Sequence, residues 1–264
     1  MLPLYFGTST ARLFGVYHPA QSAPVRTCGV VLCAPGGHEY LRAHRALRQL
    51  AMILSGAGFH VLRFDYFGSG DSAGEAEDGG VARWIADIGT AIEELKDTAD
   101  VPRVALVGLR LGATLAARVS EDRTDIDSLL LWDPVISGRT YLQDLRRLQQ
   151  RWLRDRPGSR WFAFSPAVTE VIGFPVTPTM RAELAQLDLQ ALRRTSLRRI
   201  VVAASDNEGA GRDWILEPGM ALPPEIALPD RPVGDWHRPE LVHTALLMPR
   251  VVERVARLMQ EHVR

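Results

Sequence analysis

The sequence predicts an α/β fold in which a mostly parallel sheet carries helices on both faces. The first observation is that short apolar runs alternate with amphipathic stretches along residues 1–137. The second is "GVVLCAP" (29–35), a continuous apolar run that stops at Pro-Gly-Gly, as a strand buried on both faces does. The third is "VARWIADIGTAIEELKD" (81–97), where apolar residues recur at helical spacing. Strands that alternate with helices form parallel sheets through right-handed crossovers.

The remaining elements of this first half follow the same two patterns. Ligands of such sheets bind at the carboxyl ends of the strands, so the loops there are where a site is expected. The patterns predict hairpin strands in "LPLYFG" (2–7) and "ARLFGVYHP" (11–19), a helix over 41–55, a strand and its loop over 59–72, a strand over 103–108, a helix over 111–119 and a strand over 126–134.

The alternation breaks between Ser137 and Arg198. This stretch is mostly helical in pattern, with an aromatic and proline-rich connector in its middle, so we expect a helical insertion over 138–198 in a core formed by 1–137 and 199–264. After it, the sequence predicts a strand over 198–205, a last short strand near "EIAL" (225–228), and a helix from about Glu240 to His262 that Pro249 kinks or splits.

Composition excludes several classes of protein. Lys plus Arg and Asp plus Glu number 31 each, and no polybasic run is present, which argues against nucleic acid or an anionic membrane as a partner. The two cysteines, Cys28 and Cys33, are too few for a disulfide framework or a zinc site. No charged-then-apolar leader and no apolar run of about eighteen residues is present. We therefore expect a soluble cytoplasmic protein without a membrane span, a metal or a cofactor.

The stretch "ALVGLRLGATLAA" (105–117) has the layout of a nucleophile elbow. An apolar strand meets Gly108, a turn follows, and an Ala- and Leu-rich helix begins after it. In the G-x-S-x-G form of this turn the central serine attacks the substrate. Here the centre is Arg110. A guanidinium stays protonated and has no lone pair, so it cannot attack a carbonyl.

These motifs resemble the α/β-hydrolase superfamily, and within it serine-aminopeptidase-like and exosortase-associated hydrolase-like proteins. The resemblance implies an α/β-hydrolase fold with a helical cap insertion, and it rests on "LFGVYHP", "LCAPGGHEYLRAHRAL", "GFHVLRFDYFGSGDSAG", "GLRLGATLA" and "LLLWDPVISG".

The catalytic positions of the family come in the chain order nucleophile, acid, histidine. The resemblance places the nucleophile at Arg110 and the acid at Asp206, with Asp133 as the alternative acid. It places the histidine at His237, with His243 as a poorer candidate. The oxyanion hole would be formed by the N–H of Leu111 and one N–H of the Gly36–Gly37 loop.

Another nucleophile could replace the missing serine. Ser69 and Ser72 lie in a glycine-rich loop in which turn formation already explains them, and Cys33 lies in an apolar strand. Ordinary serine hydrolysis through residue 110 is therefore not expected, and a displaced nucleophile remains the alternative.

Two interpretations of Arg110 stay open at this point. A helix N-terminus and an oxyanion hole favour negative charge, so Arg110 could face a cleft and bind a carboxylate or phosphate. A buried guanidinium could instead pair internally with Glu39, Asp133 or Asp206. Glu39, which follows His38, either projects into the cleft or serves the first turn of the next helix.

Aromatic residues of the insertion bear on the ligand. They suit an apolar ligand such as an acyl chain, and equally the core of the insertion or a homodimer contact. The leading hypothesis is a hydrolase-like protein that binds, or acts non-hydrolytically on, an acyl or carboxylate-bearing small molecule. The alternatives are an esterase, thioesterase or acyltransferase with a displaced nucleophile, and a partner-binding pseudoenzyme. The aromatic residues concerned are Trp152, Trp161, Phe162, Phe164 and Phe174.

Overall fold

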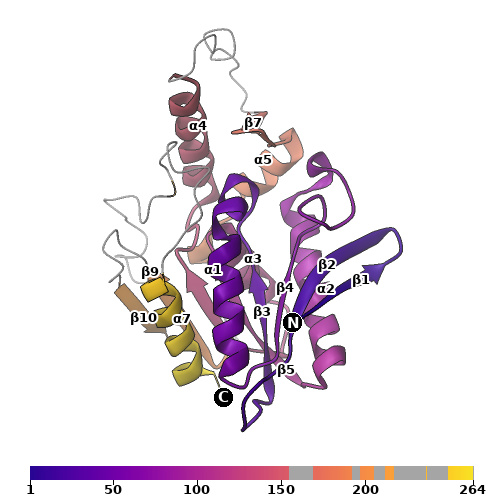
Figure 1. The fold of residues 1–264 in the computed structure, drawn as a ribbon. Helices are drawn as coiled ribbons and strands as arrows, with labels where there is room; N and C mark the ends of the chain where they lie inside the picture. Colours follow the sequence, from indigo (N-terminus) through magenta and orange to yellow (C-terminus); the bar gives the residue numbers. More distant parts are fainter. Residues whose placement is uncertain (155–168, 192–196, 205–211, 217–235, 237–248, 264) are drawn as a thin grey trace.

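An eight-stranded sheet forms the centre of the protein (Figure 1). In the computed structural model the described residues are 1–154, 169–191, 197–204, 212–216, 236 and 249–263. The strand order is β1-β2-β4-β3-β5-β6-β9-β10, and the five strands from β4 to β9 are parallel to one another. The strands are β1 (Leu2–Thr8), β2 (Ala11–His18), β3 (Cys28–Cys33), β4 (Val61–Phe64), β5 (Arg103–Leu109), β6 (Ile126–Trp132), β9 (Arg199–Ala204) and β10 (Arg212–Leu216).

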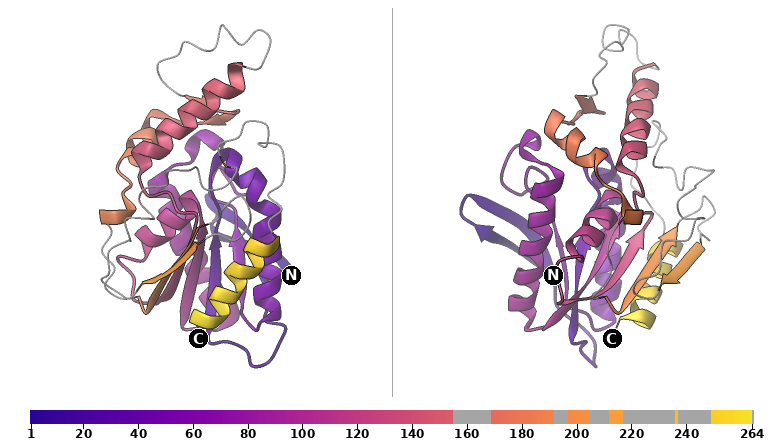
Figure 2. Two further views of the ribbon diagram at one scale, coloured as in Figure 1. Left: turned by 90° about the vertical axis from the view of Figure 1, so that its left-hand side faces the viewer. Right: turned by 180° about the vertical axis from the view of Figure 1, so that it is seen from behind.

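Helices cover both faces of the sheet, as the sequence predicts. α1 (Gly37–Gly56) packs beside α7 (Pro249–His262), and α2 (Val81–Ala99) packs beside α3 (Leu111–Val119) (Figure 2). The central strands are buried along their length because helices lie on either side: all seven residues of β6 are buried. The predicted fold class is therefore confirmed.

Both edges of the sheet are antiparallel. β1 and β2 form the predicted hairpin, and β2 also runs antiparallel to β4. At the other edge β10 pairs antiparallel with β9. This strand was not predicted, and the strand expected over 225–228 lies outside the described residues. The described part of the last helix begins at Pro249, and the part of the predicted helix before it, residues 240–248, lies outside the described residues.

The inserted segment (residues 138–198) connects two neighbouring parallel strands, β6 and β9. Its described elements are α4 (Gly138–Arg154), a small hairpin of β7 (Glu170–Val171) and β8 (Phe174–Pro175), and α5 (Pro178–Ala185), followed by a short 3-10 turn, η3 (Leu189–Ala191). The helices at its two ends agree with the sequence pattern. Figures 1 and 2 show α4, the small hairpin and α5 beyond the carboxyl ends of the parallel strands.

One carboxylate fastens the inserted segment to the core at α2. The N-cap of α2 is Gly80, which has no side chain to satisfy the first N–H groups of the helix. Glu183 of α5 does so instead, since its Oε2 accepts hydrogen bonds from the N–H of Val81 at 2.7 Å and of Ala82 at 3.4 Å. The negative charge is also favourable at a helix N-terminus.

Candidate functional site

The chain turns sharply at Arg110, between the end of β5 and the start of α3. Arg110 has φ 55° and ψ −122°, a backbone conformation that residues other than glycine rarely adopt. The glycines on either side permit the turn. A Cβ at Gly108 would lie 2.3 Å from Cα of Ala113, and one at Gly112 would lie 2.3 Å from the carbonyl oxygens of Cys33 and Ala34. The strand–turn–helix geometry expected of the elbow is therefore present.

The guanidinium of Arg110 is turned into the protein. The residue is 8% exposed. Its Nε donates to Oε1 of Glu39 at 3.0 Å, and its Nη1 donates to the carbonyl oxygen of Asp133 at 3.3 Å. The rings of Tyr141 and Trp236 lie 5.9 and 5.6 Å from its Cζ, a separation typical of cation–π contacts. The structure therefore agrees with the second interpretation of Arg110, in which the guanidinium forms an internal ion pair with Glu39.

Glu39 connects this pair to the inserted segment. It lies in the first turn of α1, which begins at Gly37, four residues earlier than the sequence pattern predicted. Its Oε2 accepts a hydrogen bond from the hydroxyl of Tyr141 on α4 at 3.1 Å, and the residue is 1% exposed. Glu39 thus joins the turn at Arg110 to the first helix of the inserted segment. We call Arg110, Glu39 and Tyr141 the buried triad.

The protonation states in the buried triad follow from burial and from Glu39. Burial by itself lowers the pKa of Arg110, but the negative charge of Glu39, together with Tyr141, Asp133 and the hydrogen bond to Glu39, outweighs burial and raises it. Burial raises the pKa of Tyr141 well above its ordinary value, and the charge of Glu39 raises it further. Arg110 therefore stays cationic and Tyr141 stays a hydroxyl donor at neutral pH.

Asp133 lies on the other side of Arg110. It follows β6, has φ 45°, and is 3% exposed. Its N–H donates to the carbonyl of Ala203 at 2.9 Å, and its Oδ2 accepts from the indole Nε1 of Trp236 at 3.3 Å. Arg110 contacts its carbonyl oxygen at hydrogen-bond distance, so Asp133 and Arg110 are neighbours through the backbone.

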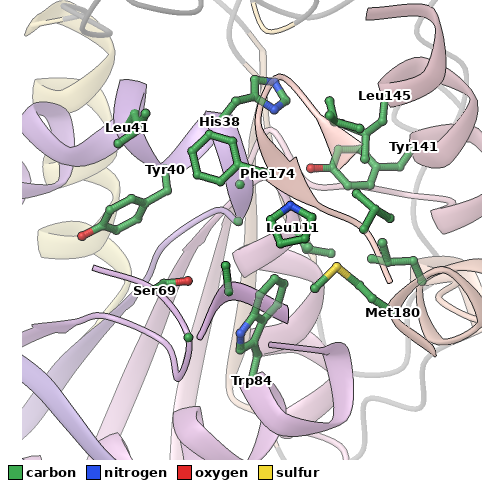
Figure 3. Close-up of a pocket in the computed structure, with 18 of the residues that line it drawn as sticks. His38, Tyr40, Leu41, Ser69, Trp84, Leu111, Tyr141, Leu145, Phe174 and Met180 are labelled. Atoms are coloured by element: carbon green, nitrogen blue, oxygen red, sulfur yellow. The ribbon is translucent and has the colours of Figure 1, made fainter. Parts of the chain in front are cut away.

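An apolar pocket of about 320 Å³ lies between the core and the inserted segment (Figure 3). Its lining consists mostly of aliphatic and aromatic side chains, and the ring of Tyr141 forms part of one wall. Glu39, Arg110 and Asp133 are not among the described residues that line it. The interpretation in which the guanidinium faces this pocket is therefore wrong, because a cation this deeply buried needs a carboxylate partner and Glu39 supplies it. The side chains labelled in Figure 3 are His38, Tyr40, Leu41, Ser69, Trp84, Leu111, Tyr141, Leu145, Phe174 and Met180.

Two helix N-termini meet at this pocket. Gly36 and Gly37, at the start of α1, and Leu111, at the start of α3, all contribute to its lining. The N–H groups of a first helical turn have no partner within the helix and favour negative charge. The structure therefore brings together the three residues assigned to an oxyanion hole, while their role as donors stays a prediction.

The alternative nucleophiles differ in their surroundings. Ser72 has a structural part: its hydroxyl donates to the carbonyl of Asp65 at 2.6 Å and accepts from the N–H of Phe14 at 2.8 Å. Cys33 is fully buried, and burial raises the pKa of its thiol, which makes it inert. Ser69 lines the pocket.

Several predicted positions lie outside the described residues. These are Asp206, His237 and His243, together with Trp161, Phe162 and Phe164 of the insertion. Among residues of the candidate site that the sequence did not single out, Tyr141 is the clearest, because only its place on the buried face of an amphipathic helix marked it. Trp84 and Tyr40 are further examples, and the hydroxyl of Tyr40 donates to Oδ1 of Asp65 at 2.5 Å in the pocket wall.

The fold and the sharp turn at Arg110, between β5 and α3, define an α/β-hydrolase-type protein. The model of the family described as serine aminopeptidase, S33, matches residues 25–168, which is more than half of the chain. The chain belongs to this family.

Curated relatives match part of the chain. An uncharacterised protein of Mycobacterium tuberculosis is 33% identical over 144 residues, covering 54% of this chain and 47% of the relative. The human protein ABHD12B is 34% identical over 109 residues, covering 40% of this chain and 29% of the relative. The chain thus spans less than half the length of these relatives.

Solved structures with a similar fold include two esterases. The Pyrococcus furiosus esterase Pf2001 is 21% identical with a TM-score of 0.48, and the match covers 61% of this chain and 60% of that one. Est1E from Butyrivibrio proteoclasticus, solved with ferulic acid bound, is 21% identical with a TM-score of 0.45, covering 52% and 56%. These likenesses concern the fold alone. None of the described helices is long and apolar enough to cross a bilayer.

Proposed function

We propose that this chain binds an acyl-type small molecule in the apolar pocket and does not hydrolyse it through residue 110. The observation that carries the proposal is the buried triad. Arg110 occupies the position that a nucleophile takes in the family, it has no lone pair to donate, and its charge is matched by Glu39. A hydroxyl at this turn would face a substrate, whereas this guanidinium faces a carboxylate of the protein itself.

The lining of the pocket supports the ligand class. A cavity of about 320 Å³ is within the range of small-molecule sites, and its walls carry Trp84, Leu145, Phe174 and Met180. Such walls suit a hydrocarbon chain. The N–H groups at Gly37 and Leu111 offer donors for one carbonyl or carboxylate oxygen of the same ligand. The ligand would therefore place its oxygen at the helix N-termini and its chain among the aromatic residues.

The test measures binding and chemistry on the same protein. A dansyl-labelled fatty acid serves as the probe, and its fluorescence reports the apparent Kd. Leu145→Trp fills the pocket and should weaken binding at least about tenfold, since the chain would lose its place. Leu142→Trp, on the same helix but outside the pocket lining, is the matched control and should bind like the wild type. Equal binding by both variants would contradict the proposed site.

Chemistry is followed with a fluorophosphonate probe and p-nitrophenyl esters. We expect no labelling and no turnover above background in the wild type. A turnover rate that Arg110→Ala abolishes, in a variant that still melts cooperatively, would show that residue 110 takes part in hydrolysis.

A displaced nucleophile is the second candidate, and Ser69 is the residue that favours it. Ser69 is the serine among the described pocket-lining residues. If the fluorophosphonate probe labels the wild type and Ser69→Ala abolishes both labelling and ester turnover while dansyl-acyl binding persists, the protein is an esterase that uses Ser69. Silence of the wild type toward the probe favours the binding function.

A further inference from the structure

The outer face of α4 carries a concentration of positive charge that the composition of the chain conceals. The whole chain has equal numbers of acidic and basic residues. α4 alone has five arginines and a single acidic residue, Asp144, which pairs with Arg147 at 3.2 Å. The five arginines are all exposed: Arg139, Arg146, Arg147, Arg151 and Arg154.

Helical geometry gathers these arginines on one side. At 3.6 residues per turn they fall within an arc of about 140°, along about 22 Å of the helix. Tyr141, Leu145 and Leu148, which are buried, lie on the opposite side. The arginine face therefore points away from the core, and Figures 1 and 2 show α4 rising beyond the sheet with its C-terminal end farthest from it.

We infer that this arginine face docks the protein on an anionic membrane surface. Exposed arginines along one face of a helix attract the anionic headgroups of a bilayer surface. The edge of the arginine face is apolar: Leu142 and Leu153 lie beside Arg146 in the helical projection and are partly exposed. Apolar residues at this edge can enter the headgroup region while the arginines stay at its polar surface.

The pocket lies at the base of the same helix. Tyr141 and Leu145 of α4 line it, and Leu41, 56% exposed, lies at its edge. A membrane surface accounts for the charge and is also a source of acyl chains. Nucleic acid fits less well, because within α4 the residues between the arginines on this face are Thr140, Gln143 and Gln150, which offer no aromatic ring to a base. Docking goes beyond the proposed function and does not depend on what the pocket binds.

The experiment is co-sedimentation of the full chain with vesicles of phosphatidylcholine containing 30% phosphatidylglycerol, compared with pure phosphatidylcholine. We expect binding to the anionic vesicles alone, and less of it as salt rises. The triple variant Arg146→Glu, Arg147→Glu, Arg154→Glu should bind at least about tenfold more weakly, since each basic residue near such a surface contributes about fivefold. None of the three lines the pocket, so the dansyl-acyl Kd should stay that of the wild type.

The matched control reverses three exposed arginines elsewhere, Arg45 and Arg48 on α1 and Arg257 on α7. It changes the net charge equally, and its vesicle binding should fall less than about threefold. Three results would overturn the proposal: no binding of the wild type to anionic vesicles at low salt, equal losses in the two triple variants, or α4-dependent binding to an RNA or DNA oligonucleotide without vesicle binding. Loss of dansyl-acyl binding in the wild type would count against the proposed function and leave vesicle docking standing.

Discussion

Two groups of ion pairs in this protein have similar geometry and opposite surroundings. In the buried triad, Arg110 and Glu39 lie 3.0 Å apart with side chains 9% and 1% exposed. At the amino-terminal end of the parallel strands, Arg123, Lys96 and Asp125 form a second network with N–O distances of 2.6 and 2.7 Å and side chains 21–25% exposed. Arg123 also contacts Glu93, which is more exposed.

Distance alone therefore does not tell what an ion pair contributes. Water screens the exposed network, so removing one member leaves the others solvated and costs little. In the buried triad, removing one charge leaves its partner in a medium that stabilises charge poorly. The exposed network can be lost, whereas the buried triad has to be kept or replaced as a unit.

The largest effect is expected for Arg110→Ala. It leaves Glu39 buried without its cation, so the free energy of unfolding should fall by about 3–5 kcal/mol, measured by urea denaturation. The combined variant Arg110→Met, Glu39→Leu, Tyr141→Phe removes all three polar groups and should recover most of that loss, because well-packed apolar groups can replace a buried ion pair. A loss below about 1 kcal/mol in Arg110→Ala would mean that Glu39 is solvated when Arg110 is absent.

A smaller effect is expected for Tyr141→Phe. It removes one hydrogen bond to a charged carboxylate, worth about 1.5–3 kcal/mol of unfolding free energy, while Arg110 still pairs with Glu39. Tyr5→Phe, an exposed tyrosine on β1, is the control and should change stability by less than about 0.5 kcal/mol.

Tyr141→Phe should also change how the free energy of unfolding depends on pH in the alkaline range. The pKa of Tyr141 is raised in the folded protein, so its contribution is complete below about pH 10, the pKa of a tyrosine in the unfolded chain, and is lost as pH rises beyond it. The free energy of unfolding of Tyr141→Phe should therefore fall less steeply above pH 10 than that of the wild type. An identical slope would contradict this assignment.

The smallest effect is expected for Arg123→Ala, with a loss below about 1 kcal/mol at low salt. The difference from the wild type should shrink in 1 M NaCl, where the Debye length is about 3 Å, whereas the loss in Arg110→Ala should hardly change. Lowering the pH should also shrink the difference in stability between Arg123→Ala and the wild type. Hydrogen bonds from Arg123 lower the pKa of Glu93 and Asp125, so their contribution is present above about pH 4 and is lost as pH falls through the lowered values.

Local patterns were enough to predict most of the fold. β3, α2 and β6 follow from apolar runs and helical spacing because burial is repeated along each element. The start of α1 was predicted too late, since Gly37 and His38 carry no helical signal and the first turn is fixed by its contacts. β10 was missed because its apolar run, Trp214 to Leu216, is only three residues long.

The candidate site was predictable in its backbone and not in its contacts. The spacing of Gly108 and Gly112 around Arg110 is enough to predict a sharp turn. The bond between Tyr141 and Glu39 joins residues that are 102 positions apart in the chain, and no local pattern encodes it. The direction of the Arg110 side chain is set by its own contact with Glu39, 71 positions away in the chain, so the choice between cleft and internal pair could not be made from the sequence.

Glu183 gives the inserted segment a reporter in the core. Because its carboxylate holds the amide protons of Val81 and Ala82, these two protons exchange with solvent only when α5 separates from α2 or α2 itself frays. The free energy of that separation is therefore recorded as a hydrogen-exchange rate at two defined amides. Any occupant that holds the inserted segment in place slows exchange at both, whatever its chemistry.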